Sequence, residues 1–377
     1  MPLTRRELLN ISSAAIPVAL VSPRLLASSS LKSMYEAGFI IDGLGGPGGL
    51  GTEPDSPLSE VEIEHIRASG LTAVHITVGT VGTMGSLEAF EKIVREITRW
   101  ENEIEIHDTV MTHIRTVAEL KSAKTDGKTG LIYGLQDGVS FEDDPGRLDA
   151  LYQVGVRVIQ PTYNRRNLLG DGCMEPADAG LSRTGIECVE RMNSLGILVD
   201  LSHCGRRTAA DAIAASTQPV SFTHTGCYAL AEHPRHRTDA EFRAVAQTGG
   251  VNGIYIMPYL AWGKQPTAND VILHIEHAIN VAGEDHVSIG TDGYISPTQL
   301  TEEYKDRFKE NTRDRARLGI AAPFETETGY LFANDLNTPR RFETLAQMLM
   351  DRGHSETRVS KLLGANLLRL FGDTWQD

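Results

Sequence analysis

Two stretches of this chain, Ile197-Leu198-Val199-Asp200-Leu201-Ser202-His203 and Pro219-Val220-Ser221-Phe222-Thr223-His224, follow one pattern. Each is an apolar, β-branched run that ends in a hydroxyl residue and then a histidine. The helix-length segment between them predicts a strand, a helix and a second parallel strand, with both histidines at the carboxyl ends of the strands. Neighbouring strands lie about 4.8 Å apart, so the two imidazoles can share one metal ion. The alternative is that each histidine only caps its strand through hydrogen bonds.

The same alternation of strand and helix continues along the chain after residue 35. Helical patterns separate many of the strand candidates, and the candidates are apolar on both faces, as a parallel sheet covered by helices requires. Eight such strands predict an α/β fold of the (β/α)8 TIM-barrel type. A doubly wound open sheet is the alternative, but no strand is followed by a glycine-rich dinucleotide fingerprint. The strand candidates are 39–42, 73–78, 130–135, 156–160, 197–200, 220–223, 250–256 and 286–290.

Length and composition narrow the class of protein. The chain has 377 residues, of which 41% are hydrophobic and 23% charged, and this suits a globular protein with a large core. Its formal net charge of −14, without a basic stripe, argues against a nucleic-acid partner. None of the four cysteines forms a CxxC motif. Cys173, Cys204 and Cys227 fall in or near loops at the predicted active face, and a disulfide among them is left open.

The N-terminal residues carry a targeting pattern. Thr4-Arg5-Arg6-Glu7-Leu8-Leu9 precedes a moderately apolar run and several small residues, which predicts a twin-arginine export signal over residues 1–30 and a periplasmic or extracellular location. An ordinary amphipathic first helix is the alternative. The apolar run is too short for a good membrane span, so we expect no stable span after signal removal. Residues 31–377 are predicted to form a single barrel domain, with an insertion around 296–336 and closing helices over 339–371.

Reactive groups of a barrel gather at the carboxyl ends of its strands. Reading those ends gives the candidates Asp42, Gln136, Asp137, Tyr163, His203, His224 and Asp292. Asp292 follows the eighth strand and suits a proton shuttle or a metal ligand, although a cap on the following turn is the alternative. Arg235, on the loop after His224, can clamp a substrate carboxylate through two parallel hydrogen bonds, or else form a surface ion pair.

These residues resemble the membrane dipeptidase family (peptidase family M19), whose members are zinc hydrolases with amidohydrolase-like barrels. The resemblance runs from Phe39 to Phe371. The motifs that carry it are Asp200-Leu201-Ser202-His203, Phe222-Thr223-His224, His233-Pro234-Arg235, Gly290-Thr291-Asp292-Gly293 and the closing Gly364-Ala365-Asn366-Leu367-Leu368-Arg369. The resemblance implies a two-zinc site with His203 and His224 on one metal, Arg235 on the substrate carboxylate and Asp292 as the catalytic aspartate. It also implies a homodimer.

Four positions depart from the family's pattern. The family has Asp-Gly-His-x-Asp after its first strand, whereas this chain has Leu44 and Gly46 in place of the histidine and the second aspartate. Gln136 replaces the glutamate that bridges the two metals, and Tyr163 replaces a histidine after the fourth strand. Leucine and glycine offer no ligand atom in their side chains, and an amide is a weak, neutral donor. A full two-zinc site is therefore not expected.

The sequence thus predicts a metal-dependent hydrolase of dipeptides or similar small amides with at most one metal, most simply Zn²⁺, on His203 and His224. Further ligands are expected from water, Asp137, Asp292, Asp171 or Glu175. Asp292 is predicted to move the proton, Arg235 to bind the substrate carboxylate, and Tyr163 to contact the substrate and donate a hydrogen bond to the oxyanion. The alternatives are a non-catalytic exported binder of peptides or amino acids, and a metal hydrolase shifted to another small amide or a lactone.

Overall fold

Eight parallel strands form the barrel that the sequence predicts. The structure, a computed structural model, describes residues 31–49, 56–79, 81–82 and 84–376. Its strands are β1 (Ile41–Gly46), β2 (Ala73–Thr77), β3 (Met111–His113), β4 (Thr129–Leu135), β5 (Val156–Ile159), β6 (Leu198–Asp200), β7 (Val220–Thr225), β8 (Val251–Ile254), β9 (Val287–Ile289) and β10 (Gly293–Tyr294). Each strand candidate coincides with or overlaps one of them. β3, which pairs only with β4, was not predicted because three residues are too few to show an alternating pattern.

The eighth strand is interrupted, and its two halves close the barrel. β9 pairs with β8, whereas β10 pairs with β1 on the other side. Between them, Asp292 N donates to the Leu44 carbonyl (2.8 Å) and the Thr291 carbonyl accepts from Ile256 N (3.2 Å). The sheet thus runs from β1 through β2, β4, β5, β6, β7 and β8 and returns to β1, which rules out the open doubly wound sheet.

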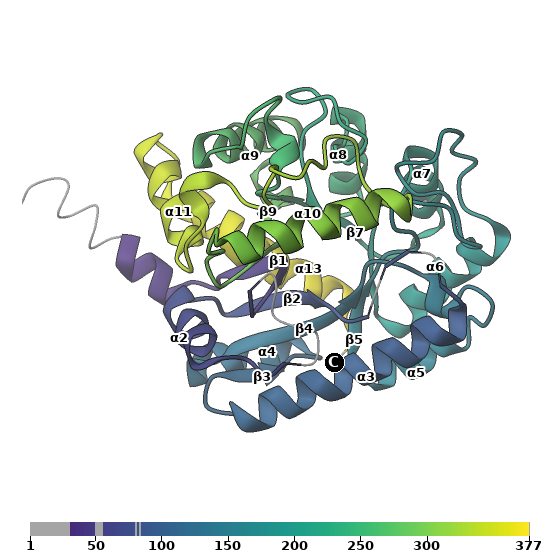
Figure 1. Ribbon diagram of the computed structural model, residues 1–377, viewed down its shortest axis with the longest axis horizontal. Helices are drawn as coiled ribbons and strands as arrows, with labels where there is room; N and C mark the ends of the chain where they lie inside the picture. The colour runs from purple at the N-terminus through teal and green to yellow at the C-terminus, as the bar shows by residue number, and fades with distance from the viewer. Residues whose placement is uncertain (1–30, 50–55, 80, 83, 377) are drawn as a thin grey trace, which may run out of the picture.

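Helices surround the strands, as Figure 1 shows. Some of them begin at a capping box, which Ser59 forms at the start of α2 and Thr238 at the start of α8. The helices are α2 (Glu60–Ser69), α3 (Ser86–Ile106), α4 (Val117–Asp126), α5 (Arg147–Gln153), α6 (Arg183–Leu195), α7 (Arg206–Ala215), α8 (Asp239–Gln247), α9 (Ala268–Ala282), α10 (Glu302–Arg317), α11 (Arg341–Asp351), α12 (Glu356–Ser360) and α13 (Asn366–Thr374). Within the described residues, no helix is both long enough and apolar enough to span a membrane.

The last helices pack against the amino-terminal end of the barrel. Asn366 Nδ2 donates to the carbonyls of Glu284 and Val287, both at 2.8 Å, next to the start of β9. Gly364 lies so close to the chain before β1 that a Cβ there would stand 2.3 Å from the Phe39 carbonyl oxygen. The opposite, carboxyl end of the barrel is therefore free of these helices.

The insertion after the eighth strand contains α10 and a long irregular segment. In Figure 1, α10 crosses in front of β1 and β7. Asn164, after β5, donates from Nδ2 to the Ile320 carbonyl (2.8 Å) and so ties the irregular segment to the barrel. The insertion therefore covers part of the carboxyl end of the strands.

Candidate active site

A cavity of about 560 Å³ lies at the carboxyl ends of the strands. It brings together five predicted site residues, namely Gln136, Tyr163, His203, Arg235 and Asp292, with Leu44 and Gly46 in the same wall. Four charged residues that no sequence motif indicates also line it, namely Glu96, Arg99, Arg315 and Glu325. The volume lies within the range of sites for small organic molecules.

His203 faces this cavity with one ring nitrogen held by the protein. Its Nδ1 lies 2.7 Å from Asn164 Oδ1, and the Asn164 amide is oriented by its hydrogen bond to the Ile320 carbonyl. Nδ1 therefore carries the proton, and Nε2 carries a lone pair. Among the described residues, the buried Nε2 has no hydrogen-bond partner. Tyr163 stacks on the ring at a centroid distance of 4.1 Å.

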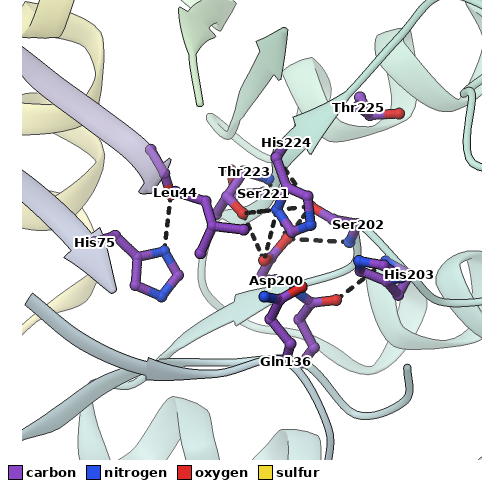
Figure 2. Close-up of polar contacts among 12 residues, drawn as sticks. Leu44, His75, Gln136, Asp200, Ser202, His203, Ser221, Thr223, His224 and Thr225 are labelled. Atoms are coloured by element: carbon purple, nitrogen blue, oxygen red, sulfur yellow. Dashed lines mark hydrogen bonds and ion pairs between the residues drawn. The ribbon is translucent and has the colours of Figure 1, made fainter. Parts of the chain in front are cut away.

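His224 is fully buried beside His203, with a centroid distance of 5.1 Å between the rings (Figure 2). The Thr223 hydroxyl donates its only proton to Asp200 Oδ2 at 2.6 Å, so at 2.8 Å it accepts from His224 Nδ1. The lone pair of this ring is again on Nε2, which has no hydrogen-bond partner in the described part of the chain. An acid that fixes a histidine tautomer through a neighbouring group is typical of metal ligation.

Both imidazoles are neutral at physiological pH. Burial lowers the pKa of His203 and of His224 well below the ordinary value, and the nearby Arg235 guanidinium lowers both further. Two buried, unprotonated nitrogens without partners fit a cation, because a metal ion accepts lone pairs that the protein leaves unused. The prediction that strand-end histidines only cap their strands does not account for these two Nε2 atoms.

Other side chains fill the positions of the missing ligands. Figure 2 shows the Leu44 side chain between His75 and the pair Asp200 and His224. A side chain at position 46 would begin 3.0 Å from the ring of Tyr294, so this space is already filled. Gln136 donates from Nε2 to Thr77 Oγ1 (2.7 Å). In the described residues, no group of three or more His, Cys, Asp or Glu side chains is arranged to hold a metal.

The acidic residues expected as further ligands lie elsewhere. Asp137 accepts hydrogen bonds from Asn167 Nδ2 (3.0 Å) and Gly82 N (3.3 Å), outside the main cavity. Asp171 is engaged by Arg166 and by Ala179 N, and Glu175 accepts from Arg166 N (2.8 Å). These bonds organise the long loop after β5, so the expectation that Asp137, Asp171 or Glu175 stands beside the histidines is corrected.

Asp292 occupies the interruption of the eighth strand. Its φ of 55° lies in the left-handed region, which aspartate tolerates better than most residues. The carboxylate lines the cavity, and burial raises its pKa to about 6 although Arg235 and Arg315 lower it. Such a pKa suits proton transfer near neutrality.

Arg235 is 2% exposed and lines the cavity. Its guanidinium donates to the Ser202 carbonyl and, at 3.4 Å, to the His224 carbonyl. Among the described residues, no carboxylate lies within 4.0 Å of it. A buried guanidinium without a counter-ion is costly, so this geometry favours an anionic group of a ligand.

A contact that the sequence analysis missed joins Tyr163 to the insertion. Arg315, from α10, pairs with both oxygens of Glu325 at 2.7 and 2.8 Å and donates to the Tyr163 hydroxyl at 3.3 Å. Burial raises the pKa of Tyr163, so its hydroxyl keeps its proton for donation. The sequence shows only that the insertion is charged, and this does not indicate which of its arginines reaches the site.

His75, on β2, is a further buried histidine that the sequence analysis did not name. Its Nδ1 lies 2.7 Å from the Gly43 carbonyl, and its Nε2 has no partner in the described residues. A Cβ at position 134 would stand 2.0 Å from that Nε2, so the nitrogen packs against the backbone of β4. His75 does not line the cavity and is not part of the candidate site.

The four cysteines are unpaired in the structure. Cys227 Sγ donates to the His274 carbonyl at 3.2 Å. Cys173 Sγ donates instead to Asn164 Oδ1 at 3.4 Å. The thiols of Cys173 and Cys227 thus bond to oxygen atoms of other residues, and the disulfide left open by the sequence is not formed.

A closed parallel barrel with ionisable groups at the carboxyl ends of its strands has the architecture of TIM-barrel enzymes. The model of the membrane dipeptidase family (peptidase family M19) matches residues 51–309, and the chain belongs to this family. Dipeptidase verJ of Clonostachys rogersoniana is 29% identical over 259 residues, which cover 68% of this chain and 58% of that protein. The chain thus spans little more than half the length of this curated relative.

Solved structures share the fold over almost the whole chain. An amidohydrolase from Pseudomonas aeruginosa has a TM-score of 0.79 and 33% identity, with 92% of this chain and 99% of that chain covered. A metallo peptidase from Rhodobacter sphaeroides, solved with a phosphinate mimic of the dipeptide L-Ala-D-Ala, has a TM-score of 0.72 and 18% identity over 89% of this chain and 99% of its own. The predicted family and TIM-barrel fold are confirmed.

Proposed function

We propose that this protein hydrolyses the amide bond of a dipeptide or a similar small amide, with at most one metal ion on His203 and His224. The observation that carries the proposal is the pair of buried, unprotonated Nε2 atoms beside the cavity that holds Asp292 and Arg235. The family supports hydrolysis, and the filled positions at Leu44 and Gly46 support the loss of the second metal.

Arg235 orients the substrate. A terminal carboxylate in the cavity would pair with the buried guanidinium, which has no other counter-ion among the described residues. His203 and Asp292 line the same cavity, so this pairing would hold the amide in the space that they share. Holding the reacting groups in one orientation lowers the entropic part of the barrier.

Asp292 moves the proton during hydrolysis. Its carboxylate takes a proton from the attacking water and delivers it to the leaving amine, so a pKa of about 6 serves both steps. Tyr163 donates its hydroxyl hydrogen toward the oxyanion, because the Arg315 guanidinium already occupies a lone pair of that oxygen.

The metal that fits this site is most simply Zn²⁺, which takes neutral imidazole nitrogens readily. Bound there, it would supply Lewis-acid polarisation and lower the pKa of a water molecule. His203 and His224 would hold it through Nε2, and Asn164, Thr223 and Asp200 would fix the two rings.

The test is dipeptide hydrolysis by purified protein, with and without added Zn²⁺. We expect activity that a chelator removes, and its loss in His203→Ala. The matched control is His354→Ala, on a half-buried histidine that pairs with Glu276 far from the cavity. Tight dipeptide binding without turnover in the zinc-loaded protein would contradict the proposal and favour a non-catalytic binder.

We also propose export by the twin-arginine route to the periplasm or beyond. The supporting pattern, Arg5-Arg6 followed by an apolar run, lies outside the described residues. Cell fractionation of an Arg5→Lys, Arg6→Lys double variant tests it, because this variant should stay in the cytoplasm. The homodimer that the family resemblance implies stays a prediction, and light scattering of the purified protein can test it.

A further inference from the structure

A second cavity, of about 270 Å³, lies next to the main one. Its wall contains Tyr259, Trp262 and Phe324, with Pro258 and Ala261 nearby. No step of the proposed hydrolysis uses this cavity. It is formed by the segment after β8 and by the insertion, two parts of the chain that are distant in sequence.

Two aromatic side chains at this cavity are unusually exposed. Trp262 is 52% exposed and Phe324 is 57% exposed, and their rings meet edge to face at a centroid distance of 4.6 Å. Phe324 also has a φ of 67°, a left-handed conformation that a bulky side chain adopts only at a cost in free energy. Exposure and backbone strain at one residue together indicate a role in binding rather than in packing.

Three nitrogen-bearing side chains in the wall of the second cavity, Gln265, Lys264 and His233, already have partners in the protein. Gln265 bonds to the backbone of Tyr330 and Phe332, and Lys264 pairs with Asp270 at 3.0 Å. His233 Nε2 lies 2.9 Å from the Pro323 carbonyl. The wall therefore offers ring faces and edges instead of free charges, and this chemistry suits an uncharged planar group.

The two cavities share part of their wall. Tyr259 lines both of them, and its hydroxyl donates to Glu325 Oε1 at 3.1 Å. Along the insertion, Phe324 and Thr326 face the second cavity, whereas Glu325 between them faces the main one. A substituent of a substrate in the main cavity would have to pass Tyr259 and Glu325 to enter the second cavity.

We propose that the second cavity binds an aromatic substituent of the substrate whose amide lies in the main cavity. The inference rests on the proposed function for the identity of that substrate, and it deepens that function by naming a substrate class: small amides that carry a carboxylate and an aromatic ring. The ring would pack against Trp262 and Phe324, as offset or edge-to-face aromatic pairs do.

Tryptophan fluorescence tests binding independently of turnover. Of the three tryptophans, Trp100 and Trp375 are buried, so Trp262 dominates quenching by acrylamide. We titrate the chelator-treated protein with N-benzoylglycine or N-acetylglycine, which share a carboxylate and an amide but differ in the ring. N-benzoylglycine should protect Trp262 from acrylamide, whereas N-acetylglycine should not.

Variants locate the ring. Phe324→Gly removes the aromatic side chain and suits the left-handed backbone, so it should fold and should weaken N-benzoylglycine binding about three- to tenfold. Val61→Ala, which trims an exposed side chain on α2, should change nothing. Equal protection by both ligands, no protection by either, or unchanged binding in Phe324→Gly overturns the second-cavity proposal.

The two proposals fail separately. A protein that hydrolyses dipeptides but shows no preference for the benzoyl ligand contradicts the second cavity alone. A protein that binds N-benzoylglycine at Trp262 but hydrolyses no amide with zinc contradicts the proposed hydrolysis and leaves the ring site intact.

Discussion

The tautomers of two histidines give the candidate site its chemistry. His203 and His224 each use Nδ1 for a bond to the protein, and this leaves both Nε2 lone pairs unused in a buried place. Hydrogen bonds behind a metal ligand set its orientation and its basicity. The residues that hold the rings therefore matter for metal affinity even though they do not touch the metal.

Thr223→Val tests this at the residue scale. Valine keeps the shape of threonine but removes the oxygen that accepts from His224 Nδ1 and donates to Asp200. We expect zinc affinity to fall about 10- to 100-fold while the fold persists. Competition with a chromogenic chelator measures the affinity, and Thr125→Val, at an exposed position of α4, is the matched control. Unchanged affinity in Thr223→Val would mean that the His224 tautomer is irrelevant.

Asp292 predicts the pH dependence of the reaction. A base must be ionised to accept a proton, and burial raises the pKa of Asp292 to about 6, so kcat/KM should rise as the pH increases through about 6. Asp292→Asn should lose at least about 100-fold in kcat and also lose this limb of the profile. A pH-rate series checks both, with the exposed Asp126→Asn as control. If Asp292→Asn stays active and the acidic limb of its pH-rate profile is unshifted, Asp292 does not transfer the proton.

The sequence indicated the motif residues of the site correctly, but not which carboxylates lie beside them. His203, His224, Arg235 and Asp292 stand at motif positions, and the structure brings them together. Asp137 and Glu175 were expected as ligands from acidity and loop position alone, but their carboxylates satisfy loop amides instead. Which carboxylate faces a cavity depends on loop conformation, and no periodic pattern encodes it.

Among the elements around the site, the regular strands and helices were predicted from the sequence, whereas the irregular segments were not. All eight barrel strands were predicted, because a strand buried on both faces has a distinct apolar signature. Helix α8 is one of the helical connections that the alternating pattern predicted, and in the structure it begins at a capping box of Thr238 and Glu241. The insertion around 296–336 was predicted without any internal structure, although its helix α10 brings Arg315 to Tyr163. A surface helix with many charges gives no indication of the one residue that turns inward.

A double-mutant cycle tests the contribution of α10. Arg315→Gln should lower kcat about tenfold, because Tyr163 loses a charged hydrogen-bond donor. Tyr163→Phe should cost a similar factor, and the double variant should cost little more than either single one. Steady-state kinetics measure the coupling, with Arg313→Gln on the exposed side of α10 as control. Fully additive losses would show that Arg315 and Tyr163 act separately.

At the scale of the whole molecule, one buried carboxylate connects the first and the last strands of the barrel. Asp42 on β1 accepts from Thr291 N (2.7 Å), Thr291 Oγ1 (2.6 Å) and Leu44 N (3.3 Å), next to the interruption of the last strand. The two bonds from Thr291 connect the first strand with the last one. The closure of the barrel therefore depends on this polar contact as well as on the backbone hydrogen bonds between the strands.

Asp42→Ala should lower the free energy of unfolding by about 3 kcal/mol, because it leaves buried donors without an acceptor. Burial raises the pKa of Asp42 to about 7, so the folded state binds the proton more tightly than the unfolded chain. The wild type should therefore lose stability relative to Asp42→Asn as the pH rises from about 4 to about 7. Urea unfolding across this pH range measures the difference in stability between the two proteins. A difference that does not change with pH would contradict the raised pKa of Asp42.

The most direct test of the central claim, a single metal site on His203 and His224, is the zinc content of each chain. Purified protein is loaded with Zn²⁺, desalted and measured by mass spectrometry of the metal together with amino-acid analysis. We expect the wild type to hold about one zinc per chain and the His203→Ala, His224→Ala double variant to hold almost none. Two zinc ions per wild-type chain, or one that persists in the double variant, would contradict the claim.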